Sequence, residues 1–430
     1  MAQGREFTDY TSLSAGIDRV FRGLVIFAML LEIVVFVEPA PVDVMLMLCL
    51  TLGLIWGKLK FTQITTLPLV GLAGFALFNL ISMADAYDPE RAVWYVFVTL
   101  YLIVSWFLFV GLMGRYGKPM VATLLYAYCA AGVISAFLGA GGYLHFLPYQ
   151  DILLLNQRAR GLFKDCNVYG PYFVPIVMLA LVRSMGDRTL FRSKIAWLTL
   201  FFTALIGMFL SFSRACWLNC AVTLVVLFAV QQIFMSSGAA ARRRLRVGAF
   251  VVVAGALCVL ILINVPSVKQ MLAIRVTSNG LQDYDRVRFA TQDLASRAAE
   301  EHPLGIGPGQ AELIFGYATH SMYMRILSEN GVLALAALLV FIAITTWRAL
   351  KNIRYGRDEW MREVNLVVFA CIIGHLVNSL FIDTVHWRHI WFIYALPWAP
   401  MRTTLNLPRA ARAAVRRRTT VWNSRLVEVE

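Results

Sequence analysis

Long apolar runs alternate with short polar links along nearly the whole chain. A helix that crosses a bilayer needs roughly 20 mostly apolar residues. The pattern therefore predicts an all-α polytopic membrane bundle of about twelve transmembrane helices, in a single domain over residues 1–430. The predicted runs lie at about 20–37, 42–57, 65–84, 92–112, 119–142, 169–185, 195–212, from 214 to just before 242, 247–265, 321–347, 364–382 and 388–401.

Composition supports a membrane protein. Hydrophobic residues make up 59% of the chain and charged residues 15%, whereas a soluble domain is about half apolar and a quarter charged. Most of the seven cysteines fall within apolar runs and show no metal-ligand spacing, so we expect neither a disulfide framework nor a metal site. The polar N-terminus lacks the pattern of a signal peptide.

The formal net charge of +14 follows the predicted topology. In a soluble protein such a charge would suggest nucleic acid as a partner, but basic residues of membrane proteins collect in cytoplasmic links. Here they lie mostly in alternate links, which predicts cytoplasmic termini and no nucleic-acid partner. The basic tail, residues 402–430, is expected to lie in the cytoplasm on anionic lipid.

Two links on the predicted external side break this charge rule. Residues 143–168 form the smaller one, with Arg158, Arg160 and Lys164, and residues 266–320 form a large loop with five basic residues. Positive charge in a short external link opposes the insertion bias, so an anionic ligand is the better explanation. Long loops cross the membrane regardless of charge, which makes the inference firmer for the smaller loop.

Several arginines of these segments are expected to meet at the outer mouth of the bundle. Two predicted spans join at Ser211–Arg214, so Arg214 must lie near the interface, where an arginine usually has a partner; the alternative is snorkelling to the headgroups. Arg286 and Arg288 lie on a predicted amphipathic helix, and a solvated face is their alternative role. Its apolar positions recur at spacings of three and four: Leu281, Tyr284, Val287, Thr291, Leu294 and Ala298.

His320 lies where the large loop meets the next apolar run, after a Gly/Pro loop at 302–309. Guanidinium groups bind phosphate through paired hydrogen bonds and can stabilise a departing diphosphate. A histidine, with an ordinary pKa of about 6.5, can take a proton from an incoming hydroxyl. The set predicts group transfer from a lipid diphosphate to a hydroxyl acceptor. Arg325 and Glu329 are expected to form a helical ion pair.

Four stretches carry a family resemblance: ARGLFKDCN (159–167), SFSRACW (211–217), HPLGIGPGQ (302–310) and THSMYMRILSENG (319–331). With them the chain resembles the O-antigen ligases, and more widely the superfamily that also holds O-antigen polymerases and protein O-oligosaccharyltransferases. The resemblance implies a GT-C-like fold in the bacterial inner membrane and a periplasmic active site. It also implies an inverting, metal-independent glycosyl transfer without cofactor, from undecaprenyl-diphosphate-linked O-antigen to lipid A-core.

The resemblance also assigns roles to residues. His320 matches the proposed base, and Arg214 and Arg288 match arginines that would hold the diphosphate; Arg160 matches a basic position of the smaller loop. Ser321 stands where the family often has asparagine. Supporting roles are expected for Arg286, Lys164, Ser321 and His302.

Other functions remain open at this stage. The polymerases carry an arginine followed eleven positions later by glycine in both loops, but Pro171 follows Arg160 and Pro308 follows Arg297 at that distance. This favours a ligase over a polymerase or a protein O-oligosaccharyltransferase. A lipid-linked sugar transporter or flippase would carry mid-span charges and a repeated half, and the chain shows few such charges and no clear repeat.

Overall fold

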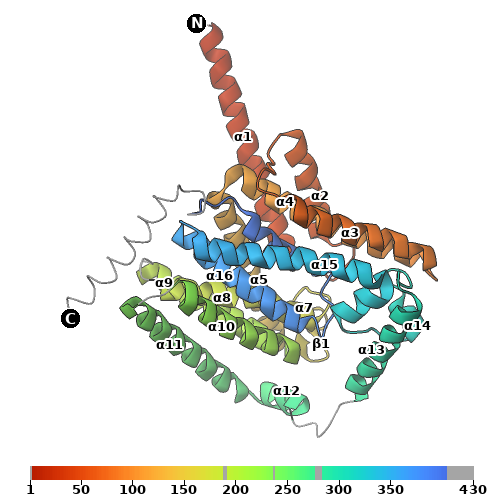
Figure 1. Ribbon diagram of the computed structural model, residues 1–430. Coiled ribbons are helices and arrows are strands. Elements are labelled where there is room, and N and C mark those ends of the chain that lie inside the picture. The colour runs from red at the N-terminus through yellow and green to blue at the C-terminus, as the bar shows by residue number, and fades with distance from the viewer. Residues whose placement is uncertain (1, 187–190, 236–237, 277–282, 404–430) are drawn as a thin grey trace.

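The computed structural model describes residues 2–186, 191–235, 238–276 and 283–403. Most of the predicted tail, 402–430, lies outside the described residues. The described chain is almost entirely helical (Figure 1). Its elements are α1 (Ala2–Leu31), α2 (Pro41–Ile55), α3 (Thr66–Ser82), η1 (Met83–Asp85), α4 (Pro89–Tyr116), α5 (Lys118–Tyr143), α6 (Gln150–Leu153), β1 (Leu154–Leu155), β2 (Arg158–Ala159), α7 (Cys166–Tyr172), α8 (Val174–Met185), α9 (Phe191–Leu210), α10 (Arg214–Phe234), α11 (Gly238–Ile263), α12 (Pro266–Val276), α13 (Asp283–Glu301), α14 (Ala311–Phe315), α15 (Met322–Tyr355), α16 (Glu359–Asn378), α17 (Arg388–Ala395) and η2 (Leu396–Trp398).

The helices confirm an all-α polytopic membrane protein. Within the described residues, nine helices are long and apolar enough to cross a membrane, counting α7 and α8 together. They account for nine of the predicted runs. The other three runs correspond to α1, to the 15-residue α2 and to the 8-residue α17, so the predicted number of twelve is not confirmed.

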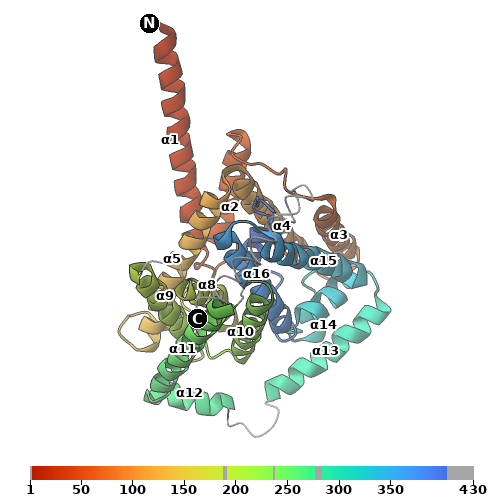
Figure 2. The ribbon, with the colours of Figure 1, turned by 60° about the vertical axis from the view of Figure 1, so that its left-hand side comes forward.

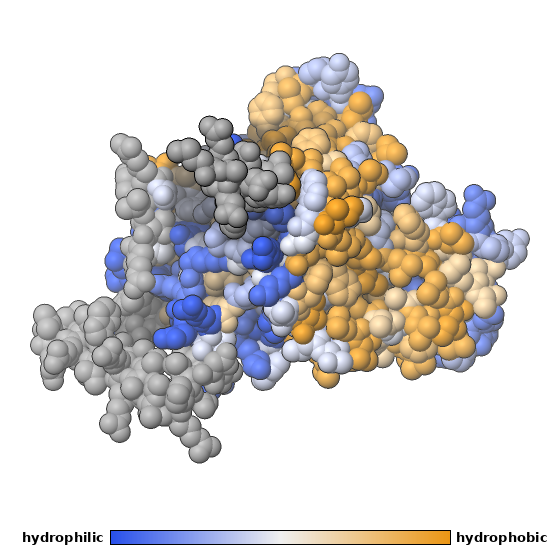
Figure 3. Space-filling view, turned by 90° about the horizontal axis from the view of Figure 1, so that it is seen from above, coloured by the Kyte–Doolittle hydropathy of each residue, from blue (hydrophilic) through white to orange (hydrophobic). Residues whose placement is uncertain are grey.

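The long helices lie side by side in the bundle. α15 packs along α3 and α16, and α10 packs along α16 (Figure 1). The N-terminal half of α1 extends away from the other helices in both ribbon views (Figure 2). Figure 3 shows a broad band of apolar residues on one face, with hydrophilic residues gathered beside it. Large apolar side chains of α10 and α11, such as Ile233 and Phe250, are also exposed, as expected of a surface that faces lipid.

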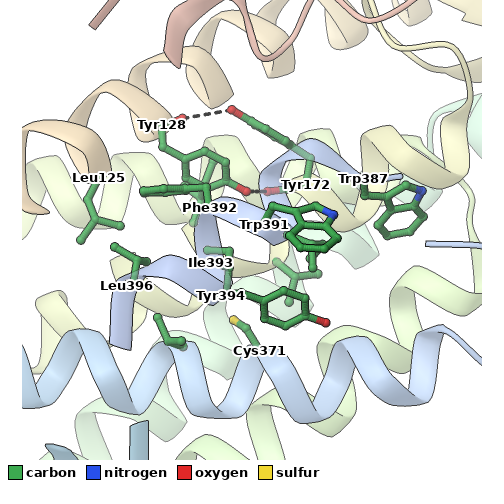
Figure 4. Packing of buried hydrophobic residues seen from close by; sticks show 14 of the residues in the cluster. Leu125, Tyr128, Tyr172, Cys371, Trp387, Trp391, Phe392, Ile393, Tyr394 and Leu396 are labelled. Atoms are coloured by element: carbon green, nitrogen blue, oxygen red, sulfur yellow. Dashed lines mark hydrogen bonds between the residues drawn. The ribbon is translucent and has the colours of Figure 1, made fainter. Parts of the chain in front are cut away.

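α17 differs from the predicted twelfth span. Its eight residues are all buried within the protein and followed directly by η2. The ring of Phe392 packs with that of Tyr128 on α5, and the ring of His389 packs with that of Tyr172 on α7 (Figure 4). Arg388, its first residue, forms two hydrogen bonds of 2.6 and 2.7 Å with the carboxylate of Asp43. Residues 388–401 are therefore apolar because most of them are buried among the other helices, and not because they form a span that faces lipid.

The two ends of the bundle differ in chemistry. At one end, Lys118 pairs with Asp358 at 2.7 Å and Arg244 with Glu359 at 3.1 Å. α16 begins at this end, and its 20 residues span about 30 Å to the other end. The second end, called the loop end here, gathers the C-terminus of α9, the N-termini of α10 and α15, and helices α12, α13 and α14 of the large loop (Figure 1).

The Gly/Pro loop is fixed to a break in α15. Gly331 interrupts that helix with φ +84°, and Gly305, Gly307 and Gly309 adopt φ values of +93°, +101° and +75°. These conformations suit glycine alone. The loop N–H of Gly307 donates to the Glu329 carbonyl at 3.0 Å. The loop therefore satisfies a helix carbonyl beside the break.

A buried charge cluster secures the same region. Arg325 donates to Glu329 at 3.0 Å, which confirms the predicted helical ion pair, and it also bonds Asp383. The Glu329 carboxylate accepts from the backbone N–H of Gly309 at 2.8 Å and of Ala311 at 3.1 Å. One cluster therefore joins the start of α15, the Gly/Pro loop and the turn after α16.

We expect Glu329→Gln to destabilise the protein strongly. Removing one partner of a buried ion pair costs about 3–5 kcal/mol, and the low end applies because Arg325 keeps Asp383. Thermal unfolding of the detergent-solubilised protein measures the effect. The matched control is Asp293→Asn, which removes the exposed pair with Arg297 at the same helical spacing and should cost less than about 1 kcal/mol. Equal shifts in the two variants would contradict a structural role for the cluster.

Candidate active site

A cavity of about 540 Å³ opens at the loop end of the bundle. Its walls come from five segments: the smaller loop, the α9–α10 join with the start of α10, α13, the residues before α15, and the turn after α16. The charged and hydrogen-bonding side chains in its wall are Asn156, Arg158, Asp165, Asn167, Ser213, Arg214, Arg288, Tyr317 and His320. Of the four predicted principal residues, the structure brings Arg214, Arg288 and His320 together here.

Arg214 is positioned by the tight join between α9 and α10. Phe212 adopts φ +47°, and Ser213 caps α10 by accepting a hydrogen bond from the N–H of Cys216 at 3.4 Å. Arg214 is the first residue of α10 and its side chain is exposed in the cavity wall. A helix N-terminus carries partial positive charge and free N–H groups. The Arg214 guanidinium and the N-terminus of α10 therefore both favour an anion in this corner of the cavity.

Arg158 is the site residue that sequence reasoning did not select. It is 9% exposed, lines the cavity, and donates to the Ser211 carbonyl at 2.7 Å and to the Asn167 side chain at 3.0 Å. Arg160 instead donates to the carbonyls of Ile152 and Asp151 at 2.9 and 3.2 Å and lies outside the cavity wall. The positive charge of the smaller loop indicated an anion site, but it could not distinguish Arg158 from Arg160 because both lie in that loop.

Arg288 faces the cavity because of how α13 is turned. The predicted amphipathic helix is confirmed, but its predicted apolar face is only partly right, because Thr291 of that face is buried and other members are exposed. Val287 and Leu294 are 46% and 45% exposed, whereas Thr291 and Ala295 are buried. Arg288 lies on the buried side, three residues before Thr291. The apolar residues on the outer face are free to meet the membrane interface.

A hydrogen bond ties α13 to the segment that carries the histidine. Gln292 donates to the Thr319 carbonyl at 2.9 Å, directly before His320. Arg286, two residues before Arg288, is exposed and does not line the cavity. Leu281, another predicted face residue, lies outside the described residues.

His320 sits in a strained backbone position. Its φ is +48°, in the left-handed region that side chains other than glycine rarely adopt, and Asn156 and Phe212 of the same cavity wall share this conformation. Such strain gathers at functional sites, where surrounding structure maintains it. Ser321 follows as the cap of α15, accepting from the Met324 N–H at 3.4 Å. Ser321 is buried and does not line the cavity.

The electrostatics of the cavity keep His320 uncharged near neutral pH. Burial lowers the pKa of the imidazole below 6.5, and the neighbouring Arg288 guanidinium lowers that pKa further. A neutral imidazole has a free nitrogen lone pair that can accept a proton.

The remaining predicted residues lie apart from the arginines. His302 is exposed at the start of the Gly/Pro loop, where its carbonyl accepts from the Gly305 N–H at 2.8 Å. Lys164 lines a second cavity, and its Nζ atom lies 4.0 Å from Oε1 of Glu38. Across the described parts of the chain, no three His, Cys, Asp or Glu side chains group as metal ligands. The positively charged side chains in the wall of the first cavity are the guanidinium groups of Arg158, Arg214 and Arg288.

Comparison with known families gives a match over part of the chain. The model of a family described as O-antigen ligase matches residues 199–339, from within α9 to within α15. The matched stretch contains Arg214, Arg288 and His320. A search of the curated proteins finds no match.

We expect the pKa of His320 to lie below 6.5 and to rise in Arg288→Gln, because the substitution removes a positive charge that disfavours the imidazolium. An NMR titration of isotope-labelled histidine, with a His320 variant for assignment, measures the pKa. Arg286→Gln is the matched control, since it removes an exposed arginine of the same helix outside the cavity and should leave the pKa unchanged. A pKa that does not move in Arg288→Gln would refute the electrostatic coupling.

Proposed function

As the chain is a member of the O-antigen ligase superfamily by its match over residues 199–339, we propose that it is an O-antigen ligase. It transfers O-antigen polysaccharide from undecaprenyl diphosphate to a sugar hydroxyl of lipid A-core. The observation that carries this proposal is the meeting of Arg158, Arg214 and Arg288 with a neutral His320 in one cavity.

The arginines bind the diphosphate of the donor. Arg214 and Arg288 come from α10 and α13, and Arg158 completes the cluster from the smaller loop. Planar guanidinium groups give paired, charge-assisted hydrogen bonds to phosphate oxygens. Negative charge on the diphosphate grows as it leaves, so fixed cations in a partly buried cavity stabilise the transition state more than the bound donor.

His320 acts as the general base. The acceptor hydroxyl gives its proton to the imidazole while its oxygen forms a bond to the anomeric carbon of the donor sugar. The bond from that carbon to the diphosphate oxygen breaks on the opposite face, and its electron pair leaves with undecaprenyl diphosphate. The configuration is inverted, and the proton passes from His320 to solvent.

Sidedness follows from the two chemically distinct ends of the bundle. Lys118, Arg244 and Arg354 lie at the end remote from the cavity, and basic residues favour the cytoplasm. This supports a cytoplasmic-membrane protein with cytoplasmic termini and a cavity that opens to the periplasm, where lipid-linked O-antigen and lipid A-core would both be reached.

Ligation is favoured over polymerisation by the sequence. Both enzymes would use a similar donor, but Pro171 and Pro308 stand where the polymerase pattern has glycine. The product distinguishes the two: a ligase attaches long chains to lipid A-core, whereas loss of a polymerase leaves cores capped with a single repeat.

We expect His320→Asn to reduce transfer by about 10²–10⁴-fold, the usual contribution of a general base. Asparagine tolerates the left-handed backbone that His320 adopts, so the change removes the base with little added strain. The assay is complementation of a deletion strain, followed by gel analysis of its lipopolysaccharide. Lipid-linked polymer should accumulate as long-chain lipopolysaccharide disappears.

The matched control is His145→Asn, at an exposed histidine with φ +62° outside the cavity. It should restore long-chain lipopolysaccharide fully. Long chains that persist in the deletion strain itself would end the ligase proposal, and single-repeat capping would indicate a polymerase.

We expect Arg214→Lys to raise the donor KM roughly tenfold or more, because lysine keeps the charge but loses the planar, paired hydrogen bonds. Kinetics of the purified protein with a lipid-diphosphate donor measure the change. Arg286→Lys makes the same substitution at an exposed position outside the cavity and should behave as wild type. Unchanged kinetics in Arg214→Lys would indicate that this arginine serves only as an interfacial anchor.

A further inference from the structure

A second cavity of about 510 Å³ meets the arginine cavity at a shared wall. Asp165, Asn167, His320 and Ile382 line both cavities. Away from this wall, the second cavity is bounded by the chain between α1 and α2, the first turns of α4, and the start of α17. A ligand in it would approach His320 from a different side than the diphosphate.

Two buried polar side chains of the second cavity lack partners within the protein. Glu32 is 2% exposed and His389 is 3% exposed, and both line the cavity. Among the described residues, neither carboxyl oxygen of Glu32 nor Nε2 of His389 has a hydrogen-bond partner. A buried polar group without a hydrogen-bond partner is energetically unfavourable, and a ligand that bonds to it removes this cost.

The position of His389 is set by its neighbours. Its ring lies 5.3 Å from that of Tyr172 and 5.7 Å from that of Trp387, measured between centroids. Aromatic packing on these sides fixes the imidazole plane, so Nε2 is held in place without a bond of its own. A group fixed in this way is preorganised for a ligand.

The charge of the second cavity differs from that of the first. It is rich in carboxyl groups, and two of its cations are already paired: Arg388 with Asp43, and Arg325 with Asp383. Carboxylates repel phosphate, but they accept hydrogen bonds from hydroxyl groups. The carboxyl-bearing residues of its wall are Glu32, Glu38, Asp43, Asp165, Glu312 and Asp383.

Aromatic side chains provide the complementary apolar surface. Trp94, Tyr95, Phe97 and Tyr101 of α4 all line the cavity, and the rings of Trp94 and Phe97 lie 6.0 Å apart. Flat rings pack against the apolar C–H faces of a sugar, and carboxyl groups bond its hydroxyls. The combination suits an uncharged, polyhydroxylated ring.

We propose that the second cavity binds the acceptor sugar, with Glu32 and His389 hydrogen-bonding its ring hydroxyls. The assignment rests on the proposed transfer activity and names the side from which its acceptor comes. The acceptor hydroxyl reaches His320 from the side of the second cavity, while the donor diphosphate is bound by the arginines of the first cavity. Glu32 and His389 position the acceptor and take no part in the proton transfer.

Steady-state kinetics of the purified full-length protein test this assignment. Glu32→Gln should raise the acceptor KM roughly tenfold, since it replaces one of the two carboxyl oxygens by an NH2 group that cannot accept a hydrogen bond from a hydroxyl. The donor KM and the melting temperature should stay at wild-type values, because Glu32 has no partner among the described residues. Glu90→Gln, at an exposed glutamate of α4 outside the cavity, is the matched control.

A second variant covers the event that Glu32→Gln does not fold. Trp94 is 50% exposed, so Trp94→Ala should fold and raise the acceptor KM. Arg214→Lys should show the opposite pattern, with a raised donor KM and an unchanged acceptor KM.

Three outcomes distinguish the failures. A raised donor KM in Glu32→Gln and Trp94→Ala would overturn the assignment and indicate that the second cavity binds the donor glycan. Wild-type kinetics in both variants would also overturn it. Absence of transfer by the wild-type protein with any lipid-A-core acceptor would instead overturn the proposed function.

Discussion

The ion cluster of Arg325, Glu329 and Asp383 is the constraint on which the loop end of the bundle depends. Unpaired, a buried guanidinium or carboxylate is too costly to leave in an apolar bundle, so the segments that carry these groups stay together. They are the start of α15, the turn after α16 and, through the Glu329 carboxylate, the Gly/Pro loop. His320, with its left-handed backbone, lies five residues before Arg325, so the segment that carries it leads directly into this assembly.

Features that depend on local pattern were predictable from the sequence. Apolar runs of membrane length gave the long helices, because lipid forces each spanning backbone to satisfy its own hydrogen bonds. The shortness of the join between α9 and α10 placed Arg214 at the loop end, and the spacing of Arg325 and Glu329 gave their ion pair. The Gly/Pro loop beside His320 marked where the conformations that only glycine favours would lie.

Features that depend on tertiary packing were not predictable. Arg158 and Arg160 are the same residue type two positions apart, and the hairpin of β1 and β2 decides which one enters the cavity. The face of α13 was partly misread because the apolar-inward rule assumes water outside, and a helix beside a membrane can leave Val287 exposed. α17 has the composition of a span, and only its contacts show it filling the bundle centre.

The charge of the two cavities provides a physical reason for their meeting at His320. A diphosphate is attracted to Arg158, Arg214 and Arg288 and repelled by the carboxyl groups of the second cavity, whereas an uncharged sugar has no net charge for the guanidinium groups to attract. Each substrate is thus confined to one side, and the shared wall is where an anomeric carbon and a hydroxyl can come together. A charged imidazole there would add a fourth cation to the donor side. Burial and Arg288 keep His320 neutral, so it is ready to accept the proton that the reaction releases.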